Sequence, residues 1–183
     1  MPSFDPGTNV LVQAPSLSSE RADQCLDMLA VGDPATLDVL RIVYSGKPQE
    51  LLDQWREEVG TMPARTGIVV VGGAPDFEGT TEVDSGETVA VTTANPNDIT
   101  GLGMRLNNYL NDTPPEAQLV VCLDSLTELL QFVDVQSAFK FLHMFTGQLR
   151  EAGAIGHFHI DPNAHDAQTI SRLKPAFDEE LTL

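Results

Sequence analysis

A carboxylate and a hydroxyl follow the most apolar run of the sequence, LVVCL at 119–123. Asp124 and Ser125 come directly after this run. In ATP-hydrolysing enzymes a buried strand delivers such a carboxylate to the magnesium ion of the nucleotide, so these two residues are the candidate nucleotide-binding pair. The alternative is local, because either side chain could cap the helix expected at 126–132 by accepting hydrogen bonds from its first amides.

The densest group of candidate metal ligands begins at His157, in the run HFHID, and continues with His165 and Asp166. Alternation along a strand places His157 and His159 on one face. Two imidazoles and the carboxylate of Asp161 form a donor set that suits zinc or nickel, although a further ligand would have to come from elsewhere in the chain. The alternative is that these side chains only form hydrogen bonds at the end of the strand.

No nucleophile with a partnering base is predicted, and no residue is assigned a catalytic role. Cys25 and Cys122 fall in apolar patterns, which raise the pKa of a thiol and suppress its reactivity, so we expect two buried free thiols. Ser125 is not set in a GxSxG motif. The spacing of Gly101 and Gly103 is more typical of close helix packing than of a dinucleotide site.

Short runs rich in Val and Ile alternate with stretches of helical periodicity, which predicts a parallel sheet covered by helices. The expected strands are 9–13, 38–44, 67–72, 88–93, 118–123, 154–160 and a more polar 177–183. The expected helices are 22–29, 51–59, 98–110, 135–150 and 164–173. The strand at 118–123 should be central because it is apolar on both faces. The segment 73–87 has no periodicity and is predicted to be an exposed, mobile loop.

The length of 183 residues suits a single domain covering 1–183. Asp and Glu number 27 against 10 Lys and Arg, a net charge of −17, while 42% of residues are apolar. This charge disfavours nucleic acid and anionic membrane surfaces as partners, and the apolar runs are too short to span a bilayer. The acidic excess with few lysines is typical of halophilic proteins, and the absence of a signal peptide favours the cytoplasm.

The motif Asp-Ser-Leu-Thr at 124–127 follows a strand and the block DITGLGMRLNNYL at 98–110, and it precedes a long helix. In these motifs and in the order of its elements, most of the chain resembles the RecA-like ATPases of the KaiC and RadA kind. It looks closest to a haloarchaeal group of such proteins that lacks the Walker A loop. The resemblance implies a three-layer α/β/α RecA-like fold of the P-loop type with a mainly parallel central sheet, and association with neighbouring protomers.

Two catalytic parts of that family are missing. The loop after the first strand should carry GK[ST], whose amides and lysine hold the phosphates, but 14–21 reads APSLSSER. The next strand usually ends in a catalytic glutamate, where this sequence has Ser45 and Gly46. Asp124 alone cannot hold a nucleoside triphosphate strongly.

The sequence therefore predicts a pseudo-ATPase that is not an enzyme and needs no cofactor. It would act as an interaction or regulatory module in a halophilic archaeal cytoplasm, bound to a protein partner or to further copies of itself. Phe141 and Met144 could form part of a partner surface. The alternative is a weak nucleotide- or metal-binding protein that uses Asp124 and the strand-end histidines. An enzyme of unrelated chemistry at the same sheet edge is a third possibility, since fold does not fix function.

Overall fold

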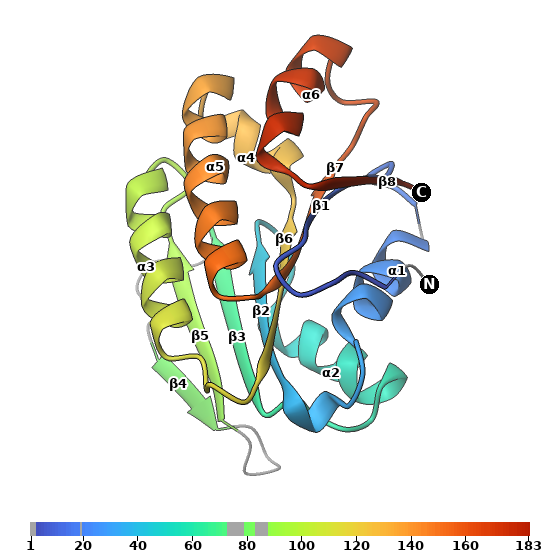
Figure 1. Ribbon diagram of the computed structural model, residues 1–183, viewed down its shortest axis with the longest axis vertical. Coiled ribbons are helices and arrows are strands. Elements are labelled where there is room, and N and C mark those ends of the chain that lie inside the picture. Colours follow the sequence, from blue (N-terminus) through green and yellow to red (C-terminus); the bar gives the residue numbers. More distant parts are fainter. Residues whose placement is uncertain (1–2, 19, 73–78, 83–87) are drawn as a thin grey trace.

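A computed structural model of the chain describes residues 3–18, 20–72, 79–82 and 88–183 (Figure 1). Its strands are β1 (Asn9–Gln13), β2 (Leu37–Val43), β3 (Arg65–Val71), β4 (Gly79–Glu82), β5 (Thr88–Ala94), β6 (Gln118–Asp124), β7 (Ile155–Ile160) and β8 (Glu179–Thr182). Its α-helices are α1 (Glu20–Leu29), α2 (Pro48–Glu58), α3 (Ile99–Asn111), α4 (Leu126–Phe132), α5 (Val135–Glu151) and α6 (Ala167–Leu173). Two 3-10 helices, η1 (Pro34–Thr36) and η2 (Lys174–Ala176), complete the described elements.

The strands form one eight-stranded sheet in the order β4-β5-β3-β2-β6-β7-β1-β8. All neighbouring strands are parallel except β4 and β5, which are antiparallel. The apolar strand β6 lies between β2 and β7, and its residues 119–123 are all buried. The prediction of a central, doubly covered strand at 118–123 is therefore confirmed.

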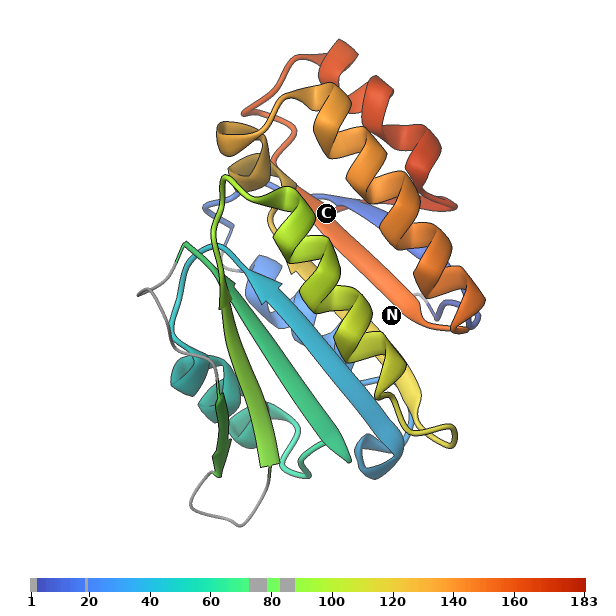
Figure 2. The ribbon, with the colours of Figure 1, turned by 90° about the vertical axis from the view of Figure 1, so that its left-hand side faces the viewer.

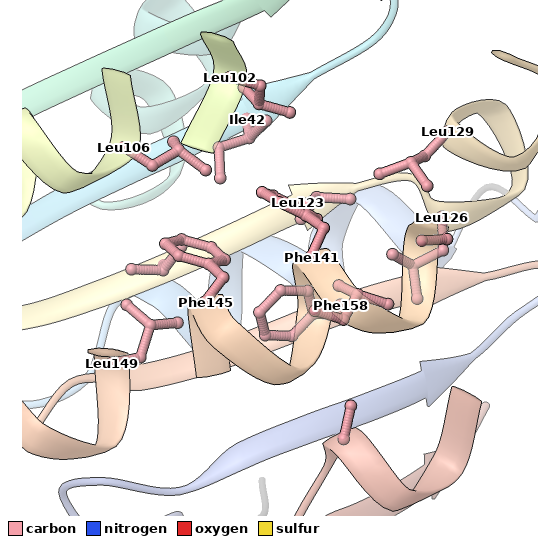
Figure 3. Close-up of a cluster of buried hydrophobic side chains, with 14 of the residues drawn as sticks. Ile42, Leu102, Leu106, Leu123, Leu126, Leu129, Phe141, Phe145, Leu149 and Phe158 are labelled. Atoms are coloured by element: carbon pink, nitrogen blue, oxygen red, sulfur yellow. The ribbon is translucent and has the colours of Figure 1, made fainter. Parts of the chain in front are cut away.

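Helices cover both faces of the sheet, which makes three layers (Figures 1 and 2). On one face α3, α4, α5 and α6 enclose the larger core, in which Phe145 and Phe158 meet edge to face with their centroids 6.1 Å apart (Figure 3). On the other face α1 and α2 cover a smaller cluster that includes Leu29, Val39 and Trp55. Side chains of the central strands alternate between the two faces of the sheet and so supply both cores.

The structure differs from the sequence prediction in one loop and at several element ends; for example, α2 begins at Pro48 rather than at 51. Within 73–87, residues 79–82 form strand β4, which pairs with β5, and the rest of the predicted mobile loop lies outside the described residues. The last α-helix begins at Ala167 rather than at 164, because the carboxylate of Asp166 caps it by accepting a hydrogen bond from the Thr169 amide. Within the described residues, no helix combines the length and apolar character needed to cross a bilayer.

Candidate functional site

The carboxyl ends of the parallel strands meet at one edge of the sheet, where Asp124 closes β6 and the loop after β1 leads into α1. Arg21 lies in the first turn of α1, the place where a phosphate loop would put the lysine of GK[ST]. Its guanidinium forms an ion pair with the Asp124 carboxylate, and the two side chains are 16% and 33% exposed. The carboxylate expected to hold magnesium is thus already paired with a cation of the same chain.

Ser125 and Thr127 are engaged within the protein. The Ser125 hydroxyl accepts a hydrogen bond from the Glu128 amide at 3.4 Å, so Ser125 caps α4 as the local interpretation expected. The Thr127 hydroxyl accepts a hydrogen bond from the backbone amide of Asp161 at 2.9 Å. The start of α4 is thereby joined to the end of β7.

Asp161 lies apart from the two histidines with which the sequence grouped it. Its carboxylate accepts hydrogen bonds from the amides of Ser16 and Asn163, each at 2.9 Å. The hydrogen bond from Ser16 holds the pKa of Asp161 below its ordinary value. Asp161 therefore fastens the loop after β1 to the end of β7.

His157 and His159 instead meet two cysteines in the interior. Cys25 of α1, Cys122 of β6 and both histidines of β7 are buried, and one ligand atom from each lies within 4.8 Å of all the others. The two Sγ atoms are 3.0 Å apart, and Cys25 Sγ is 3.7 Å from His157 Nε2. Two thiols and two imidazoles in this arrangement form a donor set for a transition metal.

Strand register explains how the four side chains converge. Cys122 and His157 are direct partners on the adjacent strands β6 and β7, so their side chains share a face. His159 follows two residues later on that face, as the sequence predicted, and its ring centroid is 5.4 Å from that of His157. Helix α1 packs over this face and supplies Cys25 one turn after Arg21.

Burial and neighbouring groups set the protonation of this cluster. The hydrogen bond with Cys122 lowers the pKa of Cys25, while burial raises the pKa of Cys122. Burial also lowers the pKa of His157, which keeps its imidazole neutral. Neither ring nitrogen of His159 has a hydrogen-bond partner, and neither does His157 Nδ1.

Comparison with known sequences places the chain in a family. Residues 7–183 match the family of unknown function DUF7504. The chain belongs to this family. A comparison of the DUF7504 chain with curated proteins finds no match.

Solved structures resemble the DUF7504 chain in fold. A Pyrococcus horikoshii OT3 protein, from a structural study of project PH0250, is 13% identical with a TM-score of 0.62, over 98% of this chain and 83% of its own. The flagellar accessory protein FlaH from Methanocaldococcus jannaschii is 9% identical with a TM-score of 0.65, over 98% of this chain and 72% of its own. Likeness at these identities shows the fold alone, and it confirms the expected RecA-like α/β fold.

A groove of about 510 Å³ runs between α3 and α5 of the DUF7504 chain. Met104 and Met144 line it and are 65% and 48% exposed. Phe141, which the sequence paired with Met144 at the surface, is 5% exposed and stacks on Phe145 in the core. Gly103 allows close packing here as predicted, since an added Cβ would lie 3.3 Å from Met144 Cε.

The roles of two residues, Arg21 and Cys25, were not predicted from the sequence. Arg21 ends the segment 14–21, in which only the missing GK[ST] residues were considered, and its partner Asp124 is 103 positions away. Cys25 was assigned to a helical apolar stripe, correctly, but nothing in the sequence shows which strand that stripe covers. The sequence did contain a signal for this cluster. Both cysteines lie in apolar patterns, and the two histidines alternate along one strand.

Proposed function

We propose that this chain is a non-catalytic RecA-like module, a pseudo-ATPase that acts by binding a protein partner. Its setting is the cytoplasm of a halophilic archaeon, which the acidic, lysine-poor composition supports. The observation that carries the proposal is the ion pair between Arg21 and Asp124. This pair neutralises Asp124, the carboxylate at the sheet edge that RecA-like ATPases would use for magnesium.

The loop before α1 offers little to a phosphate group. A phosphate-binding loop directs free backbone amides at its ligand. Here the Ser16 amide donates to the Asp161 carboxylate at 2.9 Å, and the Ser18 amide donates to the Pro15 carbonyl at 3.1 Å. The Asp161 carboxylate at this loop also repels phosphate. A triphosphate bound here would have to break these contacts and displace Arg21 from Asp124.

Calorimetric titration with ATP and magnesium in molar KCl tests the absence of a nucleotide site. We expect no saturable binding, that is, a Kd weaker than about 1 mM. Binding in the micromolar range contradicts the proposal, and its loss in Asp124→Asn would establish the alternative of a degenerate nucleotide site. Asp53→Asn, a substitution of an exposed carboxylate on α2, is the matched control.

The partner part of the proposal is supported by the groove between α3 and α5. Exposed methionines adapt to varied apolar side chains, and exposed apolar grooves mark protein contacts. Lys140 lines the same groove and is one of three lysines in a chain of net charge −17. The occupant that fits is an apolar segment of another protein that carries an acidic residue to meet Lys140.

A photo-crosslinking residue in place of Met104, introduced in a halophilic host, tests this surface. We expect one partner protein to be captured, and we expect Lys140→Glu to abolish the capture by charge repulsion. Gln136→Glu, on the exposed surface of α5 and outside the groove lining, should leave the capture unchanged. Capture of a second copy of this chain, or of nothing, contradicts the proposed occupant.

A further inference from the structure

We propose that Cys25, Cys122, His157 and His159 bind one zinc ion in a closed tetrahedral site. The site lies between α1 and the strands β6 and β7, in the interior of the α1 face. It uses neither Arg21 nor Asp124, so it stands independently of the missing nucleotide chemistry. Nothing about a pseudo-ATPase requires it; the spacing of the ligand atoms, the unpartnered ring nitrogens and the neighbouring charge support it.

The geometry is close to that of a tetrahedral S₂N₂ site. Zinc bonds of about 2.3 Å to sulfur and about 2.0 Å to nitrogen put the ligand atoms of such a site about 3.3 to 3.8 Å apart. The distance of 3.7 Å between Cys25 Sγ and His157 Nε2 is in this range, and the 3.0 Å between the two sulfurs is about 0.8 Å shorter than the separation of about 3.8 Å expected for two sulfurs on one zinc. Since all four ligand atoms lie within 4.8 Å of one another, shifts of about 1 Å or less complete the tetrahedron.

The histidines carry polar atoms that the protein leaves without partners. His159 is fully buried, and neither of its ring nitrogens has a hydrogen bond. Buried polar atoms are almost always paired, so a buried imidazole without a hydrogen bond calls for another explanation. A metal ion at the centre of the group provides a bond to one nitrogen of each histidine.

The charges around the cluster favour thiolates. Zinc with two thiolates and two neutral imidazoles is a neutral unit, which removes the cost of burying an unpaired charge. Arg41 of β2 is the register partner of Cys122 and is itself buried, with no hydrogen-bond partner for Nε or Nη1. Its guanidinium supplies positive charge beside Cys122, which favours a thiolate over a neutral thiol there.

Donor type and burial define the metal and its role. Thiolate with imidazole selects zinc over magnesium or calcium, which prefer oxygen ligands. Four protein ligands leave no open position, so the site is structural rather than catalytic. It ties α1 to two central strands, and since Cys25 follows Arg21 by one helical turn, it fixes the helix that holds Arg21 against Asp124.

Metal analysis of the intact chain decides the question. The protein is produced with zinc in the medium, purified under reducing conditions and examined by elemental and native mass spectrometry. We expect one zinc ion per chain. A metal-free chain whose mass is lower by two hydrogens, the signature of a disulfide between Cys25 and Cys122, overturns the proposal, and so does a metal-free reduced chain that takes up no added zinc.

Cobalt substitution reports on the ligands themselves. We expect Co²⁺ added to the chelator-treated protein to give the intense visible bands of tetrahedral coordination and a thiolate charge-transfer band. Cys25→Ser should weaken cobalt binding at least about a hundredfold, because loss of a direct ligand exceeds the effect of losing an outer-shell partner. His143→Gln, at an exposed histidine of α5, should bind as the parent does. A parent spectrum without thiolate bands refutes the site even if Cys25→Ser does not fold.

Discussion

At the residue scale, Arg21 limits the ability of the Asp124 carboxylate to bind a cation. Without it, Asp124 would stand partly exposed at the strand ends, available to a cation. We expect Arg21→Gln to lower the free energy of unfolding by only about 1 kcal/mol, because the pair is partly solvated. We also expect the variant not to gain ATP binding, because the Ser16 amide stays bound to Asp161.

Urea unfolding and calorimetric titration in molar KCl measure the two effects of Arg21→Gln. Arg56→Gln, which removes the half-buried partner of Asp53 on α2, controls for the loss of an arginine. If Arg21→Gln bound ATP in the micromolar range, the ion pair alone would be what closes the site, and the loop contacts would count for little.

Asp38 carries a buried charge that two neighbouring side chains compensate. It is fully buried at the start of β2, where Arg65 Nη1 lies 3.0 Å from its Oδ2 and the Tyr109 hydroxyl donates to its Oδ1. The Arg65 guanidinium also lies 3.7 Å from the centroid of the Tyr109 ring. We expect Asp38→Asn to cost about 3 kcal/mol of unfolding free energy, because it leaves Arg65 without its buried counter-charge.

Equilibrium urea unfolding in molar KCl checks the Asp38 prediction. Asp53→Asn, at the exposed pair on α2, should change the free energy of unfolding by less than about 0.5 kcal/mol. If the two substitutions lowered the free energy of unfolding equally, burial of Asp38 would not strengthen its ion pair with Arg65.

Individual site residues could be predicted only where the signal was local. Alternation along one strand suffices to put His157 and His159 on one face. The partners of these residues come from β6 and α1, and the pairing of Cys122 with His157 depends on a register that no local pattern encodes. Asp161 was grouped with the histidines by sequence proximity, whereas the strand ends before it and its carboxylate meets the β1 loop.

At the element scale, three of the described α-helices begin at aspartates whose carboxylates accept hydrogen bonds from amides of the first turn. Asp98, Asp134 and Asp166 cap α3, α5 and α6 in this way, at 2.8, 2.8 and 2.7 Å. The hydrogen bond from Ser137 lowers the pKa of Asp134 from its ordinary value of 3.8. A carboxyl whose pKa is depressed by folding stabilises the fold above pH 3.8, and that contribution is lost as the pH falls through the folded value.

This linkage predicts a specific effect of Asp134→Asn. Asparagine still caps a helix but does not titrate in acid, so the melting temperature near pH 7 should fall only slightly. Between pH 5 and pH 2 the variant should lose less stability than the parent. Calorimetric melting across this pH range measures the difference, and parallel curves for the two proteins would contradict the linkage.

Element positions could be read from the sequence because most strands are buried on both faces. The runs at 67–71 and 119–123 are apolar without interruption, so the sequence alone locates these strands. The strand that was missed, Gly79–Glu82, is short, polar and at the sheet edge, where no hydrophobic pattern is required. Helix ends depended on capping residues, which is why Asp166 moved the start of α6.

At the scale of the whole molecule, the strand order brings the site together. Strands β6, β7 and β1 are neighbours although they are far apart in the chain, and their carboxyl ends gather Asp124, Asp161 and the loop before α1. Parallel neighbours require crossover connections, so strands adjacent in the sheet need not be consecutive in the chain. Residues that are distant in the sequence therefore meet at the strand ends. The resemblance to RecA-like proteins predicted a mainly parallel sheet but no strand order, and composition and periodicity could not supply the order either.

The net charge of −17 predicts how the whole chain responds to salt. Repulsion among carboxylates is screened within about 3 Å at 1 M salt and within about 10 Å at 0.1 M. We therefore expect the melting temperature to rise by about 5 °C or more between 0.1 M and 2 M KCl, equivalent to about 2 kcal/mol for a chain of this size. Neutralising the exposed carboxylates Asp27, Glu116 and Glu179 as amides should raise stability in dilute salt and flatten the dependence. A salt response that the amide variant leaves unchanged would point to apolar burial as its cause, and a flat response in the parent would remove the argument for a halophilic setting.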